Sequence, residues 1–466
     1  MKTARARLLS SLALAGAAAA SILLAPSEAQ ANGRFPESNA YFFSPSDPNT
    51  VILRVTFGLL VSKDRGLTWD HICEPAIGLT GSEDPMFSIT PKGTWIGSTF
   101  SGVALSPDNG CAWSLVKGPI ADLVFVDLTN RPATPDKVIA FASSYAGQDP
   151  DLNPFYESNL WETADDGQSW TRITPVTLPK ELLGETVDVA PSDDQRIYVS
   201  MLKNAGQESR QGVLMVSNDH GKTFTSLPVP LEDDEKAPFI AAVHPTNADR
   251  IYIRTSNATD RPSRLMVSDD AGKTFRTVFK GNGPLMGIAF NTDHTKIWVG
   301  GPLDGLQVAS TTDFVFTKKT NISIQCLSFQ SDGLWACSNE AGGFVAGVSK
   351  DEGSTFEAKL RLCGIRGALE CPVGTLANFE CVQGGKSAQR AQTWPAQNAR
   401  LGCGIDPNDA GPEGGDAEAG PAPPPGDDDG GGCTMTVPTR FSPIAAVIAA
   451  GLAAVAIVRR RRSSRR

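Results

Sequence analysis

The chain has 466 residues, and its 51 acidic and 42 basic side chains leave a formal net charge of -9 at pH 7. This acidic balance argues against a nucleic-acid partner or an anionic lipid surface bound through bulk electrostatics. The 45 glycines and 33 prolines, beside only 5 tyrosines, favour many short strands joined by tight turns over long helices.

The first 31 residues predict a signal peptide. A basic segment at residues 2–7 precedes an apolar stretch at residues 8–24, and Ala29-Gln30-Ala31 gives a small-x-small cleavage pattern before Asn32. An uncleaved N-terminal membrane anchor is the alternative. Because export brings a chain into an oxidising compartment, the nine cysteines suggest disulfides.

One eight-residue motif, Ser/Thr-x-Asp-x-Gly-x-Thr/Ser-Trp/Phe, recurs along the chain. Six copies keep the aspartate and the glycine, at residues 62–69, 106–113, 163–170, 217–224, 268–275 and 349–356. A decayed copy without the glycine, the sixth in chain order, spans residues 310–316. Successive copies start 39 to 57 residues apart, and self-similarity at such a period indicates a propeller or a solenoid.

Each copy is surrounded by four short β-rich runs. In the fifth repeat these runs are residues 239–245, 250–254, 265–267 and 274–278, and the motif lies between the third and the fourth. Four short strands make one propeller blade. The sequence therefore predicts an all-β fold, a seven-bladed β-propeller of four-stranded antiparallel blades over residues 39–360.

The motif has a physical role at this turn. Its Ser, Thr and Asp oxygens can accept hydrogen bonds from nearby backbone N–H groups, its Gly supplies a positive φ, and its Trp or Phe packs between blades. The motif resembles the Asp-box, or BNR, repeat of sialidases, sortilin-like receptors and xyloglucanases, over roughly residues 39–360. In those families the box is a structural turn. The resemblance thus implies structural roles for Asp64, Asp108, Asp165, Asp219, Asp270 and Asp351.

Long loops between the second and third strands of blades 3, 4 and 5 form the candidate ligand site. They span residues 144–159, 203–211 and 256–262 and should project from one sector of one face. Aromatic, amide and carboxylate side chains together suit a sugar or a peptide, although solvated loops without a ligand are the alternative. The candidate ligand-binding residues are Tyr145, Asp149, Asp151, Tyr156, Arg210, Asp260 and Arg261.

Cofactors are not expected, and calcium is only a weak alternative. Residues 149–153 alternate oxygen ligands as a calcium loop does, but they lack the glycine and the distal glutamate of an EF-hand. The four histidines show no HExxH spacing, which argues against a zinc site. No metal site is therefore predicted.

Two kinds of glycoside hydrolase are alternatives to a binding protein. A sialidase needs three arginines around the substrate carboxylate and a tyrosine–glutamate pair, and Arg34-Phe35-Pro36 matches its Arg-Ile-Pro stretch poorly. A xyloglucanase-like enzyme needs two carboxylates facing across a cleft and pairs two propellers, whereas this chain has one. We therefore predict no catalytic residues, and a non-enzymatic surface protein that binds a glycan or protein ligand. An exo-acting hydrolase and a structural coat protein are the alternatives.

The cysteines predict disulfide bonds on the outside of the propeller. Cys326 and Cys337 lie symmetrically about a turn and should bridge two neighbouring strands. Cys73 and Cys111 suggest a bridge between blades 1 and 2. The four cysteines in residues 361–404 predict a small disulfide-held cap, loosely resembling the cysteine-rich module that follows the sortilin propeller; they are Cys363, Cys371, Cys381 and Cys403.

The tail predicts surface anchoring. Residues 405–432 are rich in Pro, Gly and Asp and read as a disordered linker. Residues 433–466 comprise Cys433, an apolar stretch at 441–458 that is long enough for a transmembrane helix, and an arginine-rich end. This arrangement resembles the MYXO-CTERM sorting tag, which implies processing and lipid attachment at Cys433. A single-pass anchor is the alternative, and either way the propeller would lie at the cell surface or outer membrane.

Overall fold

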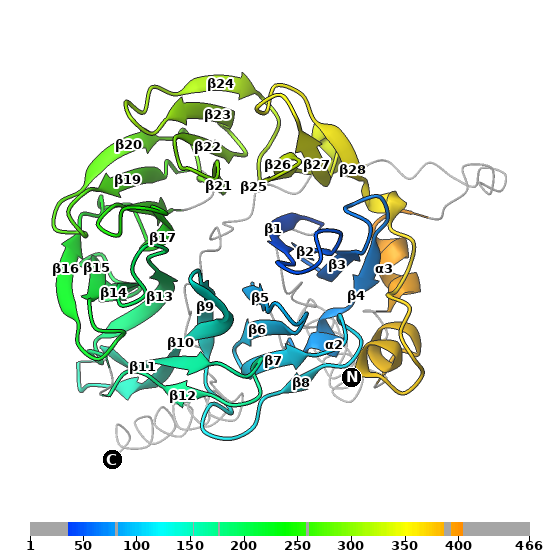
Figure 1. Ribbon diagram of the computed structural model, residues 1–466, viewed down its shortest axis with the longest axis horizontal. Coiled ribbons are helices and arrows are strands. Elements are labelled where there is room, and N and C mark those ends of the chain that lie inside the picture. The colour runs from blue at the N-terminus through cyan, green and yellow to red at the C-terminus, as the bar shows by residue number, and fades with distance from the viewer. Residues whose placement is uncertain are drawn as a thin grey trace, which may run out of the picture.

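Seven four-stranded antiparallel sheets are arranged as blades around a central axis (Figure 1). This computed structural model describes residues 36–79, 83–151, 153–175, 178–257, 261–385 and 393–403. Within each blade, strands pair in chain order from the innermost to the outermost. The predicted fold, an all-β seven-bladed propeller, is confirmed.

The first four blades are built as follows. Blade 1 contains β1 (Ser38–Phe43), β2 (Val51–Val55), β3 (Gly58–Ser62) and β4 (Asp70–Ile72). Blade 2 contains β5 (Phe87–Ile89), β6 (Trp95–Thr99), β7 (Gly102–Ser106) and β8 (Ser114–Leu115). Blade 3 contains β9 (Phe125–Arg131), β10 (Thr134–Gln148), β11 (Pro154–Thr163) and β12 (Thr171–Arg172). Blade 4 contains β13 (Leu182–Val189), β14 (Ile197–Lys203), β15 (Gln211–Ser217) and β16 (Thr225–Val229).

The last three blades repeat the pattern. Blade 5 contains β17 (Ala237–Val243), β18 (Ile251–Ser256), β19 (Arg264–Ser268) and β20 (Arg276–Lys280). Blade 6 contains β21 (Gly287–Phe290), β22 (Lys296–Gly301), β23 (Gly305–Ser310) and β24 (Thr317–Thr320). Blade 7 contains β25 (Cys326–Gln330), β26 (Gly333–Cys337), β27 (Ala346–Ser349) and β28 (Glu357–Leu360).

The helices are short. They are α2 (Glu74–Ile77), the 3-10 turns η1 (Glu340–Gly342) and η2 (Leu362–Gly364), the π-helix η3 (Asn378–Val382) and α3 (Trp394–Arg400). Among the described residues, no helix has the length and apolar character needed to cross a membrane. The predicted signal peptide, linker, Cys433 and helix at 441–458 lie outside the described residues.

The repeated motif forms the turn between the third and fourth strand of each blade, as predicted. In blade 4, Ser217 Oγ accepts a hydrogen bond from Gly221 N at 2.8 Å, and Asp219 accepts from Thr223 N at 2.8 Å and from Thr223 Oγ1 at 2.6 Å. The two bonds from Thr223 lower the pKa of Asp219 to about 2. His220 and Gly221 are both left-handed, with φ of 60° and 79°. The left-handed residue before the glycine was not predicted.

The motif glycines differ in how much room their neighbours leave, which predicts a graded effect of substitution. A Cβ added to Gly353, at φ +88°, would lie 2.2 Å from Leu306 Cδ2, whereas one added to Gly221 would lie 3.4 Å from Ile173 Cδ1. We expect Gly221→Ala to cost about 1 kcal/mol of folding free energy, for the left-handed backbone alone. Gly353→Ala should cost about 2–4 kcal/mol, because the buried Leu306 must also repack. Urea denaturation measures both, and equal losses would contradict the steric argument.

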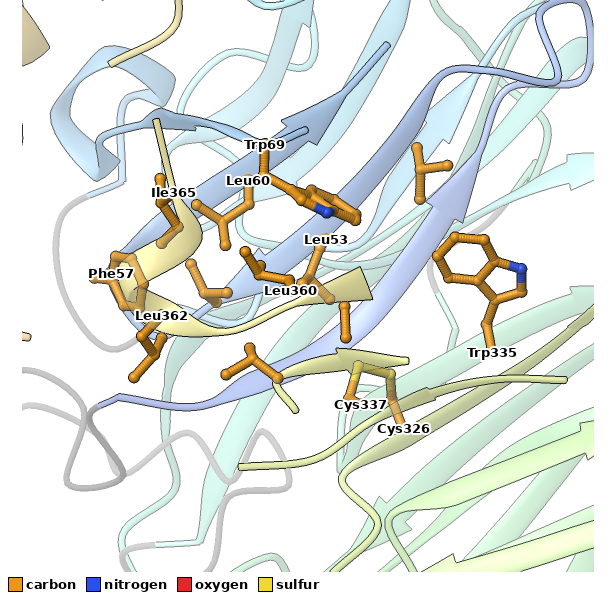
Figure 2. Close-up of a cluster of buried hydrophobic side chains, with 14 of the residues drawn as sticks. Leu53, Phe57, Leu60, Trp69, Cys326, Trp335, Cys337, Leu360, Leu362 and Ile365 are labelled. Carbon is orange, nitrogen blue, oxygen red and sulfur yellow. A yellow bond between two sulfur atoms is a disulfide. The ribbon is translucent and has the colours of Figure 1, made fainter. Parts of the chain in front are cut away.

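Blades 7 and 1 close the ring without exchanging a strand, since each takes its four strands from its own end of the propeller. Tyr41 OH donates to Ala336 O at 2.9 Å, and Ser38 Oγ donates to Val345 O at 2.9 Å. Beneath these bonds, one apolar cluster spans the seam (Figure 2). Its labelled side chains include Leu53, Phe57, Leu60, Trp69, Trp335, Leu360, Leu362 and Ile365.

The segment after blade 7, residues 361–385 and 393–403, crosses the seam as a strap on the outside of the ring. It pairs in parallel with β4, because Arg366 N donates to Trp69 O at 3.0 Å and His71 N donates to Gly367 O at 2.8 Å. Leu369 N then donates to His71 O at 2.8 Å. The strap therefore adds a short parallel bridge to the outer edge of blade 1.

Two disulfides fix the strap to the propeller and correct the predicted pairing. Cys73 bonds to Cys381 and Cys111 bonds to Cys371, across 308 and 260 residues of sequence. The predicted bridge between Cys73 and Cys111 is wrong, because the strap runs along the rim of blades 1 and 2 and supplies a partner to each. Only Cys363–Cys403 closes the strap on itself, so the four cysteines do not form a self-contained cap. The predicted Cys326–Cys337 bridge is confirmed.

Candidate functional site

The longest predicted loop, in blade 3, is largely a β-hairpin. Strands β10 and β11 stay paired up to Gln148 and Pro154, so the connecting loop is only residues 149–153. Tyr145 and Tyr156 lie opposite each other in this hairpin, with ring centroids 6.5 Å apart. Tyr145 is 42% exposed, whereas Tyr156 is 3% exposed and packs in the core. Of the two tyrosines, only Tyr145 offers its ring at the surface.

The carboxylate of Asp149 holds the hairpin loop. It accepts hydrogen bonds from Asp151 N and Asn153 N, both at 2.9 Å, and from Asn153 Nδ2 at 2.9 Å. The bonds from Asn153 lower the pKa of Asp149, which keeps it ionised. Within the described residues, no three His, Cys, Asp or Glu side chains are placed to hold a metal ion.

The loops of blades 3 and 4 contact each other. Gln207 Nε2 in the blade 4 loop donates to Asn153 Oδ1 at 3.1 Å. The guanidinium of Arg210 donates to three backbone carbonyls, those of Glu235 at 2.6 Å, Gln207 at 2.8 Å and Asp233 at 3.0 Å. Arg210 therefore joins the blade 4 loop to the segment that leads into blade 5. We call residues 145–151, 153–156, 203–211 and 231–236 the loop platform.

A buried ion pair supports the platform from below. Arg264, on β19, donates from Nε and Nη2 to the two carboxylate oxygens of Glu235, at 2.7 and 2.6 Å. The side chains of Arg264 and Glu235 are only 9% and 2% exposed. The carboxylate of Glu235 also accepts from Thr255 Oγ1 at 2.6 Å and from Glu232 N at 2.7 Å. These bonds fix the segment that carries the acceptors of Arg210.

The predicted site residues thus have different environments. Tyr145 and Asp151 lie at the surface of the platform, Asp149 and Arg210 hold its backbone, and Tyr156 lies beneath it. Arg261 is exposed in the blade 5 loop, and Asp260 lies outside the described residues. The structure brings the loops of blades 3 and 4 together, and their residues at the surface stay candidates for ligand contact.

Three acidic residues on inner strands had not been predicted as part of a site: Asp127, Glu185 and Asp188, which we call the acidic wall. Asp127, on β9, accepts from Leu128 N at 2.8 Å and from Val187 N, on the neighbouring β13, at 2.9 Å. Asp188 accepts from Thr129 Oγ1 at 3.3 Å. Burial raises the pKa of Asp127 to about 8 and that of Asp188 to about 7.

Glu185 lies at the bulge of β13 and is 2% exposed. Neither of its carboxylate oxygens has a hydrogen-bond partner in the part of the chain that the structure describes. Burial raises its pKa well above the usual range, and the charge of Arg254 in blade 5 opposes that shift. The pKa of Tyr156 rises to about 12, mainly through burial and then through the charge of Glu185. Glu185 and Asp188 interrupt a mainly apolar strand, which is a partial sequence signal, but the burial of Glu185 depends on the neighbouring blades.

The acidic wall lacks the arrangement of a glycosidase pair. Hydrolases of that kind place two carboxylates on opposite sides of the scissile bond. Here Asp127 accepts from the amide of the residue next to Asp188, so the two carboxylates lie side by side on neighbouring blades. A groove of about 380 Å³ occurs elsewhere, in the strap, lined by Leu369, Asn378, Val382 and Trp394 among others.

The buried acids and histidines predict how stability depends on pH. Burial lowers the pKa of His71 and His294 from 6.5 to about 4. The stability that these neutral histidines contribute to the folded state is therefore complete above about pH 6.5 and is lost as pH falls through 4. Asp127 and Asp188 have raised pKa values, about 8 and about 7. The stability that their protonated carboxyl groups contribute to the folded state is therefore present below about pH 3.8 and is lost as pH rises through 7 and 8. The two effects oppose each other between pH 4 and 6.5.

Above pH 6.5 only the carboxyl effect remains, so the free energy of unfolding should fall between pH 6.5 and 8. Urea denaturation across this range measures the fall. Asp127→Asn and Asp188→Asn combined should make this fall smaller, because an amide does not ionise, whereas Glu185, whose pKa burial also raises, keeps its share of it. An unchanged slope in the double variant would show that other groups cause the pH dependence.

A family model matches part of the propeller, from the second half of blade 2 to the end of blade 6. The model of the Sortilin-Vps10 family (Sortilin, neurotensin receptor 3) matches residues 101–321. This segment contains the loop platform and the acidic wall. The VPS10 domain-containing receptor SorCS2 of Homo sapiens is 26% identical over 125 residues, which cover 26% of this chain and 9% of the receptor.

The solved structures that match this chain do so at low sequence identity. An ancestral GH74 enzyme is 12% identical, with a TM-score of 0.49 over 69% of this chain and 46% of that one. Hydrazine synthase of Kuenenia stuttgartiensis is 8% identical, with a TM-score of 0.49 over 68% of this chain and 97% of that one. The chain thus spans less than half of the GH74 chain and about a tenth of the curated receptor.

Proposed function

We propose that this chain is a non-enzymatic binding protein, displayed outside the cell, that holds a protein or glycan ligand on its loop platform. The observation that carries the proposal is the pre-formed platform inside the segment that matches a receptor family. Gln207 and Arg210 fix its loops before any ligand arrives, so little conformational entropy is lost on binding. The exposed ring of Tyr145 provides an aromatic surface of the kind that often dominates binding energy.

Substitution of Tyr145 tests the site. We expect Tyr145→Ala to weaken ligand binding about tenfold and to leave the thermal unfolding midpoint unchanged, because this ring is half-exposed. Leu67→Ala is the matched control, since Leu67 is 73% exposed in the motif turn of blade 1, far from the platform. The measurement is titration with ligands selected from glycan and peptide arrays. Equal affinity of the two variants would place the site elsewhere.

Display at the cell surface is part of the proposal and has its own test. The resemblance of residues 433–466 to a sorting tag supports it, and Cys433 would be the lipid-attachment position. We expect Cys433→Ala to release the protein from the cell surface into the medium, as followed by surface labelling. Unchanged retention and tail processing would reject the tag.

A further inference from the structure

The strap carries a concentration of exposed apolar side chains. Of the eight large apolar or aromatic side chains that are exposed in the described part of the chain, three lie within residues 373–382: Val373, Phe379 and Val382. The groove of about 380 Å³ lies in the same segment, and Val382 lines it together with Leu369 and Trp394. We call it the strap groove. Apolar surface gathered in one place on a protein marks a site that another segment or molecule covers.

Covalent bonds hold the walls of the strap groove. Its lining residues Cys371 and Cys381 form the disulfides to Cys111 and Cys73 of the propeller. Ala377 N also donates to Cys111 O at 3.1 Å. The groove is therefore fixed to the rim of blades 1 and 2 before anything occupies it, so filling it requires little ordering of its walls.

Trp394 gives the strap groove a hydrogen-bond donor as well as an aromatic surface. Its ring contacts the buried His71, with the ring centroids 5.4 Å apart. The indole N–H groups of Trp113 and Trp170 donate to backbone carbonyls at 2.8 and 2.9 Å, whereas that of Trp394 donates to no acceptor among the described residues. The Trp394 nitrogen is not fully buried. The groove therefore favours an occupant that is apolar and brings a carbonyl oxygen.

A proline-rich segment of the same chain has this chemistry. Residues 421–425 read Pro-Ala-Pro-Pro-Pro. Each proline offers a carbonyl acceptor and an apolar ring but no N–H, so a proline run brings few donors that the groove would have to satisfy. Proline-rich segments also favour an extended helix that docks in aromatic-lined grooves at little cost in conformational entropy.

The chain leaves the strap close to the strap groove. Trp394 is the first residue of α3, which is seven residues and therefore about 10 Å long and lies on the outside of the ring beside β4 (Figure 1). Soon after α3 comes Cys403, which its disulfide to Cys363 holds in place. A segment as long as residues 404–420 spans about 23 Å on average. Residues 421–425 can therefore reach the groove from the end of the strap.

We infer that residues 421–425 dock in the strap groove of the same chain, with the Trp394 indole donating to a proline carbonyl. The docked segment ties the tail to the rim of blades 1 and 2, which leaves the loop platform of blades 3 and 4 open to its ligand. The inference concerns a different surface from the platform and does not depend on the proposed function.

Hydroxyl-radical footprinting of the full-length protein tests the inference, because it measures how accessible each side chain is to solvent. The variant replaces the four prolines of residues 421–425 by alanine. A tethered segment has an effective concentration of about 1 mM, so a contact with a Kd of about 0.5 mM is occupied about two-thirds of the time. Oxidation of Trp394 and Val382 should therefore rise about threefold in the variant. Oxidation of Val373, which is 87% exposed and does not line the groove, should stay the same.

Pro407→Ala with Pro412→Ala is the matched control, since it removes prolines of the tail that lie outside the docking segment. It should keep Trp394 protected. A synthetic peptide of residues 419–427, added to the four-proline variant, should restore the protection, and the same peptide with alanine for proline should not. Equal oxidation of Trp394 in the parent chain and the four-proline variant would overturn the inference. Protection that is lost when the protein is diluted would also overturn it, because a second copy would then be the occupant.

Discussion

Removal of the two disulfides that fix the strap should cost about 5 kcal/mol of folding free energy, since each closes a very long loop and such cross-links restrict the unfolded chain most. The bonds join Cys73 to Cys381 and Cys111 to Cys371, across 308 and 260 residues. All four cysteines must be replaced together, so that no free thiol can form a new bridge. Because the strap crosses the seam, blades 7 and 1 should lose protection from hydrogen exchange first.

The control removes Cys326–Cys337, which closes only 11 residues of sequence between two paired strands. Replacing both of its cysteines by alanine should cost about 3 kcal/mol or less, because a short loop restricts the unfolded chain less. Guanidinium denaturation under oxidising conditions compares the two variants. A larger loss in the control, or hydrogen exchange that spreads evenly over all seven blades, would contradict the role of the strap in closing the ring.

Arg264→Met should lower the free energy of unfolding by about 3–5 kcal/mol, because it leaves the carboxylate of Glu235 buried without its cation. Glu235 is 2% exposed and receives both of its ionic hydrogen bonds from Arg264. The platform should also become less ordered, because Arg210 donates two of its three hydrogen bonds to carbonyls of the segment that Glu235 holds in place.

The double variant Arg264→Met with Glu235→Leu separates the two causes of that loss. It removes the unpaired charge, so most of the stability should return. Ligand affinity should stay low, since the carbonyl acceptors of Arg210 lose their support. Urea denaturation and ligand titration are measured on the same samples. A double variant no more stable than Arg264→Met would mean that packing, and not the unpaired charge, causes the loss.

The fold was predictable because it depends on local and repeated signals. Each motif copy forms its own turn through bonds that span only four residues, such as Thr223 N to Asp219, so the sequence spacing reports the blade count directly. The bridge between Cys326 and Cys337 was predictable for the same reason, since their positions about one turn set the strand register.

Contacts between distant segments were not predictable in this way. The strap disulfides join residues more than 250 positions apart, and no local pattern shows that residues 366–369 pair with β4. The blade 3 hairpin was mistaken for a loop because its Gly147, Asp149 and Pro150 are turn residues, although the strands pair beyond the usual blade length. The acidic wall escaped prediction because the burial of Glu185 depends on neighbouring blades, which its own strand does not reveal.

The most direct test of the account is an array of glycans and peptides incubated with residues 32–403, with product release followed in parallel by mass spectrometry. We expect saturable binding to a discrete set of ligands, weakened by Tyr145→Ala, with every ligand recovered intact. Release of cleaved products from any bound glycan, lost in Asp127→Asn or Asp188→Asn, would contradict a binding protein and identify the acidic wall as a hydrolytic site.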